Sequence, residues 1–116
     1  MIKYDDDIGA YVIEYDDVIV CWEEEPEGSR QAAADDVRAA YNRNIRHIAE
    51  AVLDEIKEIY DVTDADEVIS KLGKPQIYPD NGEVVYCEHS FDDTHIISFE
   101  YSDNDFTDID YVSIDG

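Results

Sequence analysis

Hydrophobic residues recur along this chain with two different periods, one typical of β-strands and one typical of an α-helix. From residue 10 to residue 22, two runs rich in β-branched and aromatic side chains flank the polar pair Asp16-Asp17. Runs of this composition around a polar break predict a β-hairpin. A short strand at Ile2–Tyr4 can precede the hairpin, and a Pro-Glu-Gly sequence marks a loop after it.

The middle of the chain carries a helical stripe of apolar residues. They follow one another at steps of three or four positions, which matches the period of about 3.6 residues in an α-helix. We therefore predict one long amphipathic helix over residues 30–60, with charged residues on the face opposite the stripe. The predicted core stripe consists of Val37, Tyr41, Ile45, Ile48, Val52, Ile56 and Ile59.

Start and stop signals outline a second, short helix and the strands after it. The segment Thr63–Glu67 can cap the helix, Gly73 ends it after about Leu72, and Pro75 prevents its continuation. The strands that follow are separated by polar turns, the first of which holds an Asn-Gly pair favoured in hairpins. These strands are predicted at residues 76–79, Glu83–Phe91, Thr94–Tyr101 and Phe106–Ile114.

This order of elements predicts an α+β fold in one domain, residues 1–116, because neither a repeat nor a linker interrupts the chain. We expect an antiparallel sheet of about five to six strands, with the long amphipathic helix packed across one face and the short helix beside it. Nine Tyr, three Phe and one Trp favour a folded core, because disordered chains lack aromatic residues.

The charge of the chain is strongly negative and unevenly distributed. The net charge is −23, of which residues 1–29 carry −9, residues 30–74 carry −3 and residues 75–116, which contain no Lys or Arg, carry −11. Such a charge acts on solubility and association, and it disfavours direct binding of nucleic acid or anionic membrane. The segments that form strands therefore display most of the excess, and we expect an acidic surface that suits a basic protein partner.

The acidic residues expected to bind that partner lie in two groups. The first group occupies the last hairpin turns and the closing strand, and the second follows the N-terminal hairpin. The first consists of Asp92, Asp93, Asp103, Asp105, Asp108 and Asp110, and the second of Glu23, Glu24 and Glu25. Tyrosine also recurs beside these segments, either as a strand and core residue or as an interface residue that stacks on Arg.

Few residues could carry catalysis or hold a metal. With 31 acidic residues, carboxylate pairs at catalytic spacing arise by chance, and none of the common nucleotide, hydrolase or zinc-protease motifs is present. Cys87, His89 and His95 could bind a metal, with Cys21 as a fourth ligand, but zinc sites have tighter paired spacings. We expect core thiols and strand-end histidines instead, and hence no catalytic residue, no metal and no cofactor.

The expected location is the cytoplasm. The chain contains no run of about 18 apolar residues, the length that a membrane-spanning helix requires. Its start lacks the basic and apolar regions of a secretory signal. Cys21 and Cys87 are expected to be reduced, as isolated cysteines are in that compartment.

The C-terminal half resembles small bacterial immunity proteins of polymorphic-toxin and contact-dependent inhibition systems. The resemblance lies in residues 86–90, residues 95–99 and the closing segment 112–116, which follow a helix of similar length. It implies a cytosolic, acidic, non-enzymatic inhibitor that binds one toxin, often a nuclease. The alternative is a DNA mimic of the anti-restriction or anti-CRISPR kind. A small metal-dependent enzyme that uses Cys87, His89 and His95 is the third hypothesis.

Overall fold

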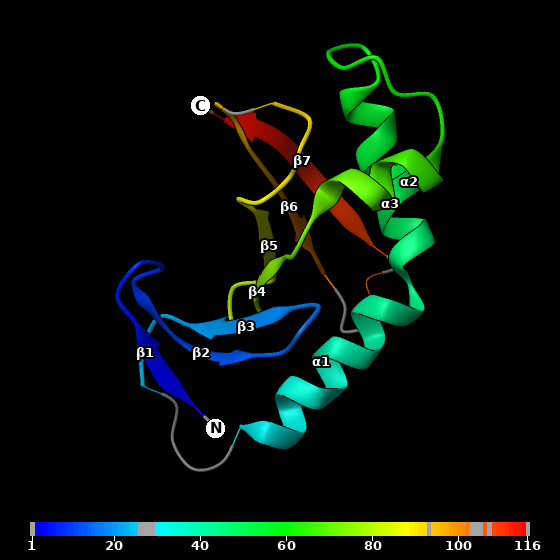
Figure 1. The fold of residues 1–116 in the computed structure, drawn as a ribbon. Coiled ribbons are helices and arrows are strands. Elements are labelled where there is room, and N and C mark those ends of the chain that lie inside the picture. Colours follow the sequence, from blue (N-terminus) through cyan, green and yellow to red (C-terminus); the bar gives the residue numbers. More distant parts are fainter. Residues whose placement is uncertain (1, 26–29, 93, 103–105, 107, 116) are drawn as a thin grey trace.

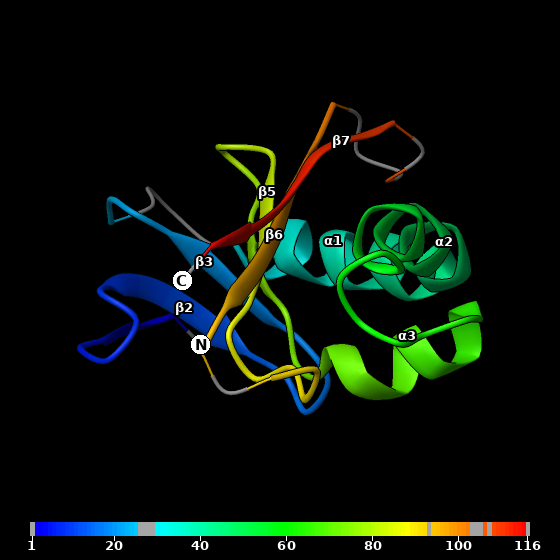
Figure 2. The ribbon, with the colours of Figure 1, turned by 90° about the horizontal axis from the view of Figure 1, so that it is seen from above.

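The computed structural model describes residues 2–25, 30–92, 94–102, 106 and 108–115. Within these residues, seven strands form one sheet in the order of the sequence, and three helices lie on one of its faces (Figures 1 and 2). The strands are β1 (Lys3–Asp5), β2 (Ala10–Glu14), β3 (Ile19–Trp22), β4 (Gln76–Tyr78), β5 (Glu83–Tyr86), β6 (Ile96–Tyr101) and β7 (Ile109–Asp115). The helices are α1 (Gln31–Arg43), α2 (Ile45–Ile56) and α3 (Ala65–Leu72).

The sheet confirms the mixed fold but differs from the expected one in strand number and direction. Seven strands replace the predicted five to six, and β3 pairs with β4 in parallel, whereas every other pair is antiparallel. The three helices connect β3 to β4, and a crossover of that length returns the chain in the same direction. The expectation of a purely antiparallel sheet was therefore wrong at this one pair.

The predicted long helix is two helices separated at Asn44. This residue has φ −109° and ψ 16°, outside the helical region. Its side-chain amide donates a hydrogen bond to the carbonyl of Ala40 at 3.0 Å, and its backbone N–H donates to both Ala40 and Tyr41 at 3.2 Å. Asparagine competes for backbone groups in this way, so α1 ends here and α2 begins at Ile45 in a new direction (Figure 1).

One residue of the predicted stripe lies outside the core. Ile59 is 62% exposed, because α2 ends at Ile56. The backbone N–H groups of Ile59 and Tyr60 both donate to the carbonyl of Ile56, at 2.9 and 2.8 Å. This turn leaves Ile59 in solvent and brings Tyr60 into a stack with Phe91, whose ring centroid is 5.3 Å away.

The short helix agrees with its sequence signals. Asp64 accepts a hydrogen bond from the backbone N–H of Glu67 at 2.8 Å and thereby caps α3. Gly73 ends the helix at φ 75°, a conformation that glycine adopts without strain. A Cβ at this position would lie 2.7 Å from the carbonyl oxygen of Glu88, so the close approach also requires glycine.

The core lies between the sheet and the helices. Side chains of α2 and alternating residues of β5 and β6 belong to one buried cluster, so these strands present one face to the helices and the other outward. The inward residues include Ile48, Val52, Ile56, Val84, Tyr86, Ile97 and Phe99. A smaller cluster on the opposite face of the sheet consists of Ala10, Val12, Ile19 and Cys21.

The C-terminal strands are shorter than the sequence predicted, and this moves Cys87 out of the core. β5 ends at Tyr86, and Cys87 follows in a bend where it is exposed. The expectation of a core thiol was therefore wrong for Cys87 and is confirmed for Cys21, which is buried. In the part of the chain that the structure describes, no helix is long and apolar enough to cross a bilayer.

Candidate functional site

The basic side chains are largely neutralised within the first two thirds of the chain. Ion pairs among the described residues join lysines and arginines to acids of the N-terminal hairpin and the helices. They are Lys3–Glu14, Lys74–Glu14, Arg38–Asp17, Arg46–Asp66, Lys57–Asp54 and Lys71–Glu67. The acids of the C-terminal strands take no part in these pairs.

Three carboxylates lie side by side across the outer face of β5, β6 and β7. Glu83 is the register partner of Glu100, and Glu100 is the register partner of Asp110. Register partners point to the same face, and neighbouring strands lie about 4.8 Å apart. This carboxylate row (Glu83, Glu100 and Asp110) faces away from the helices, because the adjacent residues Val84 and Phe99 are in the core. Like charges in direct opposition destabilise a sheet.

A β-bulge interrupts β7 directly after Asp110 and contains Tyr111. Between the pairs Ser98–Ser113 and Glu100–Asp110, β7 has one residue more than β6. Tyr111 is in this bulge with φ 55°, a left-handed conformation, and its side chain is 75% exposed. A residue other than glycine at positive φ costs about 1–2 kcal/mol, and bulges redirect side chains. The chain thus bears strain at an exposed tyrosine that follows Asp110 of the carboxylate row in the sequence.

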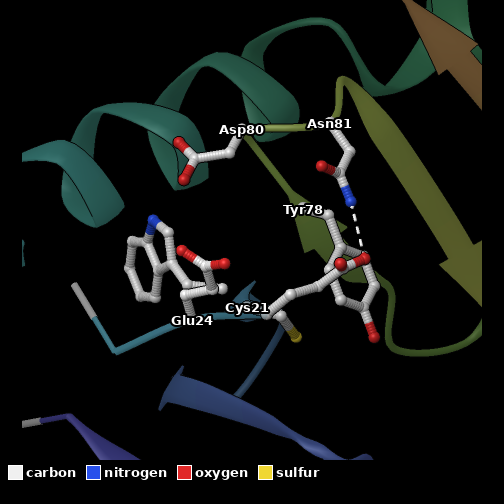
Figure 3. Close-up of a pocket in the computed structure, with 7 residues that line it drawn as sticks. Cys21, Glu24, Tyr78, Asp80 and Asn81 are labelled. Carbon is white, nitrogen blue, oxygen red and sulfur yellow. Dashed lines mark hydrogen bonds between the residues drawn. The ribbon is translucent and has the colours of Figure 1, made fainter.

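A pocket of about 230 Å³ adjoins the other end of the row (Figure 3). It lies where the parallel strands β3 and β4 end, and Tyr78, the register partner of Glu83, is part of its wall. Asn81 donates a hydrogen bond to Glu23 at 2.8 Å across it. Burial raises the pKa of the Cys21 thiol to about 12, which keeps it protonated. The lining residues are Cys21, Trp22, Glu23, Glu24, Tyr78, Asp80 and Asn81.

The acidic residues predicted from the sequence to bind a partner lie in different places in the structure. Glu23 and Glu24 line the pocket, and Glu25 is exposed just beyond it. Asp108 and Asp110 are exposed, and Asp110 belongs to the carboxylate row. The remaining candidates Asp93, Asp103 and Asp105 lie outside the described residues.

Asp92 is committed to contacts within the protein. It accepts hydrogen bonds from the hydroxyl of Tyr60, from the backbone N–H groups of Thr94 and His95, and contacts the His95 ring at 2.8 Å. The Tyr60 hydroxyl, followed by the backbone donors, holds the pKa of Asp92 far below its usual value. This carboxylate therefore fastens the β5–β6 loop to the end of α2, and its oxygens are already occupied.

The metal-ligand candidates Cys87, His89 and His95 lie in the same loop region, but they are not brought together as a set of ligands. The His89 ring is 8% exposed, and its Nδ1 accepts from the backbone N–H of Phe91 at 3.2 Å. Its Nε2 therefore carries the proton and donates to the carbonyl of His95 at 2.6 Å. Both ring nitrogens are thus used. Among the described residues, no three His, Cys, Asp or Glu side chains are grouped so that they could hold a metal ion.

Sequence reasoning missed three residues of this surface, Asp80, Glu83 and Glu100, and it left Tyr111 open between a core role and an interface role. Alternation along each strand could have placed Glu83 and Glu100 on the outer face. Their direct opposition depends on register, which a single sequence does not specify, and the bulge at Tyr111 has no sequence signal of its own.

Comparisons with protein-family models, with curated proteins and with solved structures gave no match to this chain.

Proposed function

We propose that this protein is a non-enzymatic inhibitor that binds a basic protein through the outer face of its C-terminal sheet, as an immunity protein binds its toxin. The observation that supports the proposal is the carboxylate row. Three acids face one another across neighbouring strands, and no ion pair among the described residues includes any of them.

The row favours a cationic partner on energetic grounds. Opposed carboxylates repel one another in the free protein, and an Arg or Lys placed between them removes this repulsion and adds attraction. Charge complementarity also steers diffusional encounter and raises the association rate. Proteins that act on nucleic acid carry cationic grooves for phosphates, so a toxin nuclease of this kind is the proposed target.

Tyr111 is the proposed aromatic anchor of this surface. Tyr111 is 75% exposed and follows Asp110 in the sequence, and tyrosine is enriched among residues that dominate binding energy. An arginine of the partner can stack on the ring while its guanidinium pairs with a carboxylate. Strain at such a position is a reason to infer function from structure.

The test is to isolate a basic partner from the native host by pull-down and to measure its association rate with this protein at low and high salt. The row variant Glu83→Gln/Glu100→Gln/Asp110→Asn should associate more slowly at low salt and show a weaker salt dependence. The matched control is Glu50→Gln/Glu55→Gln/Glu58→Gln, which removes three negative charges from the exposed side of the helical region. Equal rates for the two variants, or a wild-type rate that salt does not alter, overturn the proposal.

A further inference from the structure

The pocket lies at the carboxyl ends of the parallel strands β3 and β4, where ligands bind in other folds. Both strands run in parallel and end together, at Trp22 and Tyr78. Loops that leave the carboxyl ends of adjacent parallel strands form crevices in which ligands bind. Here these loops supply Glu23 and Glu24 on one side and Asp80 and Asn81 on the other.

Asn81 and Glu23 bond to each other, but three other polar groups in this pocket have no partner within the described part of the chain. Figure 3 shows the carboxylates of Glu24 and Asp80 directed into the same part of the pocket. Neither of them makes a hydrogen bond or an ion pair with another described residue. Trp22 lines the pocket with only 3% of its surface exposed, and its indole N–H likewise lacks an acceptor among the described residues. Two acceptors with negative charge and one donor are therefore available to a ligand.

We propose that this pocket binds an arginine residue of a protein partner. The guanidinium pairs with Glu24 and Asp80, and a backbone carbonyl of the same segment accepts from the Trp22 indole. Among the described residues, the lining contains three carboxylates and no basic side chain, so it selects a cation. Its volume of about 230 Å³ is below the roughly 300–1,000 Å³ of sites for drug-sized ligands, which fits a single side chain.

The chemistry of the pocket favours guanidinium over other cations. A metal ion is disfavoured because the carboxylates are not grouped as ligands among the described residues. A planar guanidinium offers five donors to two separated carboxylates, whereas a lysine ammonium is a compact point charge. The aromatic walls of Trp22 and Tyr78 also suit a flat cation.

This inference rests on the proposed function, because it assigns the arginine to the basic partner. The pocket adjoins the carboxylate row through the pairing of Tyr78 with Glu83. A partner that covers the row therefore also reaches the mouth of the pocket. The row supplies long-range attraction, and the pocket supplies one specific, largely desolvated contact.

The pocket can be tested without the partner, because Trp22 is the sole tryptophan of the chain and its fluorescence reports on this site. The probe is N-acetyl-arginine amide, titrated at low ionic strength. The neutral isostere N-acetyl-citrulline amide and the lysine analogue serve as comparisons. We expect saturable binding of the arginine probe, weaker binding of the lysine probe and none of the citrulline probe.

Variants locate the binding. Glu24→Gln and Asp80→Asn should each weaken binding of the arginine probe by roughly tenfold, since each removes a charge-assisted hydrogen bond. Glu50→Gln, which changes the same charge on α2, should bind like wild type. Circular dichroism verifies that each variant is folded. Binding of citrulline as tight as arginine, or equal affinity in all variants, overturns the inference.

The same variants separate this inference from the proposed function. If the basic partner binds with the expected salt dependence but the arginine probe does not bind, the pocket inference fails and the function stands. If the probe binds at the pocket but the row variant associates with the partner like wild type, the proposed function fails. In that case the pocket is a site for free guanidinium compounds.

Discussion

The hydroxyl oxygens of Tyr41 and Tyr86 lie 2.6 Å apart in the core and join α1 to β5. Tyr86 has no exposed surface, and Tyr41 is 4% exposed. Burial raises the pKa of Tyr86 well above its usual value, so both groups are neutral and each satisfies the other. Tyr41 also makes an edge contact with Phe106, whose ring centroid is 5.7 Å away. The pair links the helical layer to the strand that begins the carboxylate row.

Removing one of these hydroxyls should cost more stability than removing both. Tyr41→Phe leaves the Tyr86 hydroxyl buried without a partner, which costs about 1–3 kcal/mol in the free energy of unfolding. Tyr86→Phe should cost a similar amount for the same reason. The double Phe variant removes both polar groups and should regain much of the loss. Urea unfolding of the four proteins measures the coupling, and additive losses would show that the hydrogen bond contributes little.

The end of α2 gives a second prediction. Ile48 is fully buried and Ile59 is 62% exposed, although the sequence places them on one helical stripe. Ile48→Ala should cost about 2–5 kcal/mol in the free energy of unfolding. Ile59→Ala should change it by less than about 0.5 kcal/mol. Comparable losses in the two variants would mean that the helix continues beyond Ile56 and buries Ile59.

The sequence predicted the types of the elements well and their boundaries less well. The helical stripe from Val37 to Ile56 and the capped helix after Asp64 depend on local spacing, which a single chain displays. The break at Asn44 depends on hydrogen bonds to Ala40 and Tyr41 that compete with an otherwise continuous pattern. The parallel pairing of β3 with β4 depends on contacts between distant segments, which periodicity does not report.

The sequence predicted that the candidate site is acidic, but it did not predict how the carboxylates are arranged in space. An excess of acid on the strand segments is evident from the sequence, and the structure places Glu23 and Glu24 in the pocket and Asp110 in the carboxylate row. Asp92 has the same composition around it, yet Tyr60 and the backbone near His95 occupy its oxygens. Which carboxylates are free is therefore decided by tertiary contacts and strand register.

The contacts of Asp92 predict a specific response to acid. Its pKa is lowered from 3.8 in the folded state, so the folded protein holds this carboxylate ionised more strongly than the unfolded chain does. This contribution to stability is present above about pH 4 and is lost as the pH falls below it. Asp92→Asn should therefore lower stability at neutral pH.

The variant should also lose less stability than wild type between neutral pH and pH 3. Urea unfolding at several pH values measures this difference. The control Asp61→Asn removes an exposed carboxylate close to Tyr60 in the sequence. A pH dependence of Asp92→Asn identical to wild type would show that the bonds to Asp92 do not influence folding.

The carboxylate row predicts that the free protein is less stable than it would be without these opposed charges. This loss of stability can be measured without the partner. Glu100 opposes Glu83 on one side and Asp110 on the other, so neutralising Glu100 removes two repulsive pairs at once. Glu100→Gln should raise the free energy of unfolding, by up to about 1 kcal/mol. Glu83→Gln and Asp110→Asn each remove one repulsive pair and should raise the free energy of unfolding less.

Added salt should stabilise wild type more than Glu100→Gln, because salt screens the repulsion that the substitution has already removed. The control Glu55→Gln changes the same net charge on the outer side of α2 and corrects for general relief of the −23 charge. If Glu100→Gln stabilises the protein no more than Glu55→Gln does, the three carboxylates do not face one another as closely as their register requires, and the proposed binding surface loses its basis.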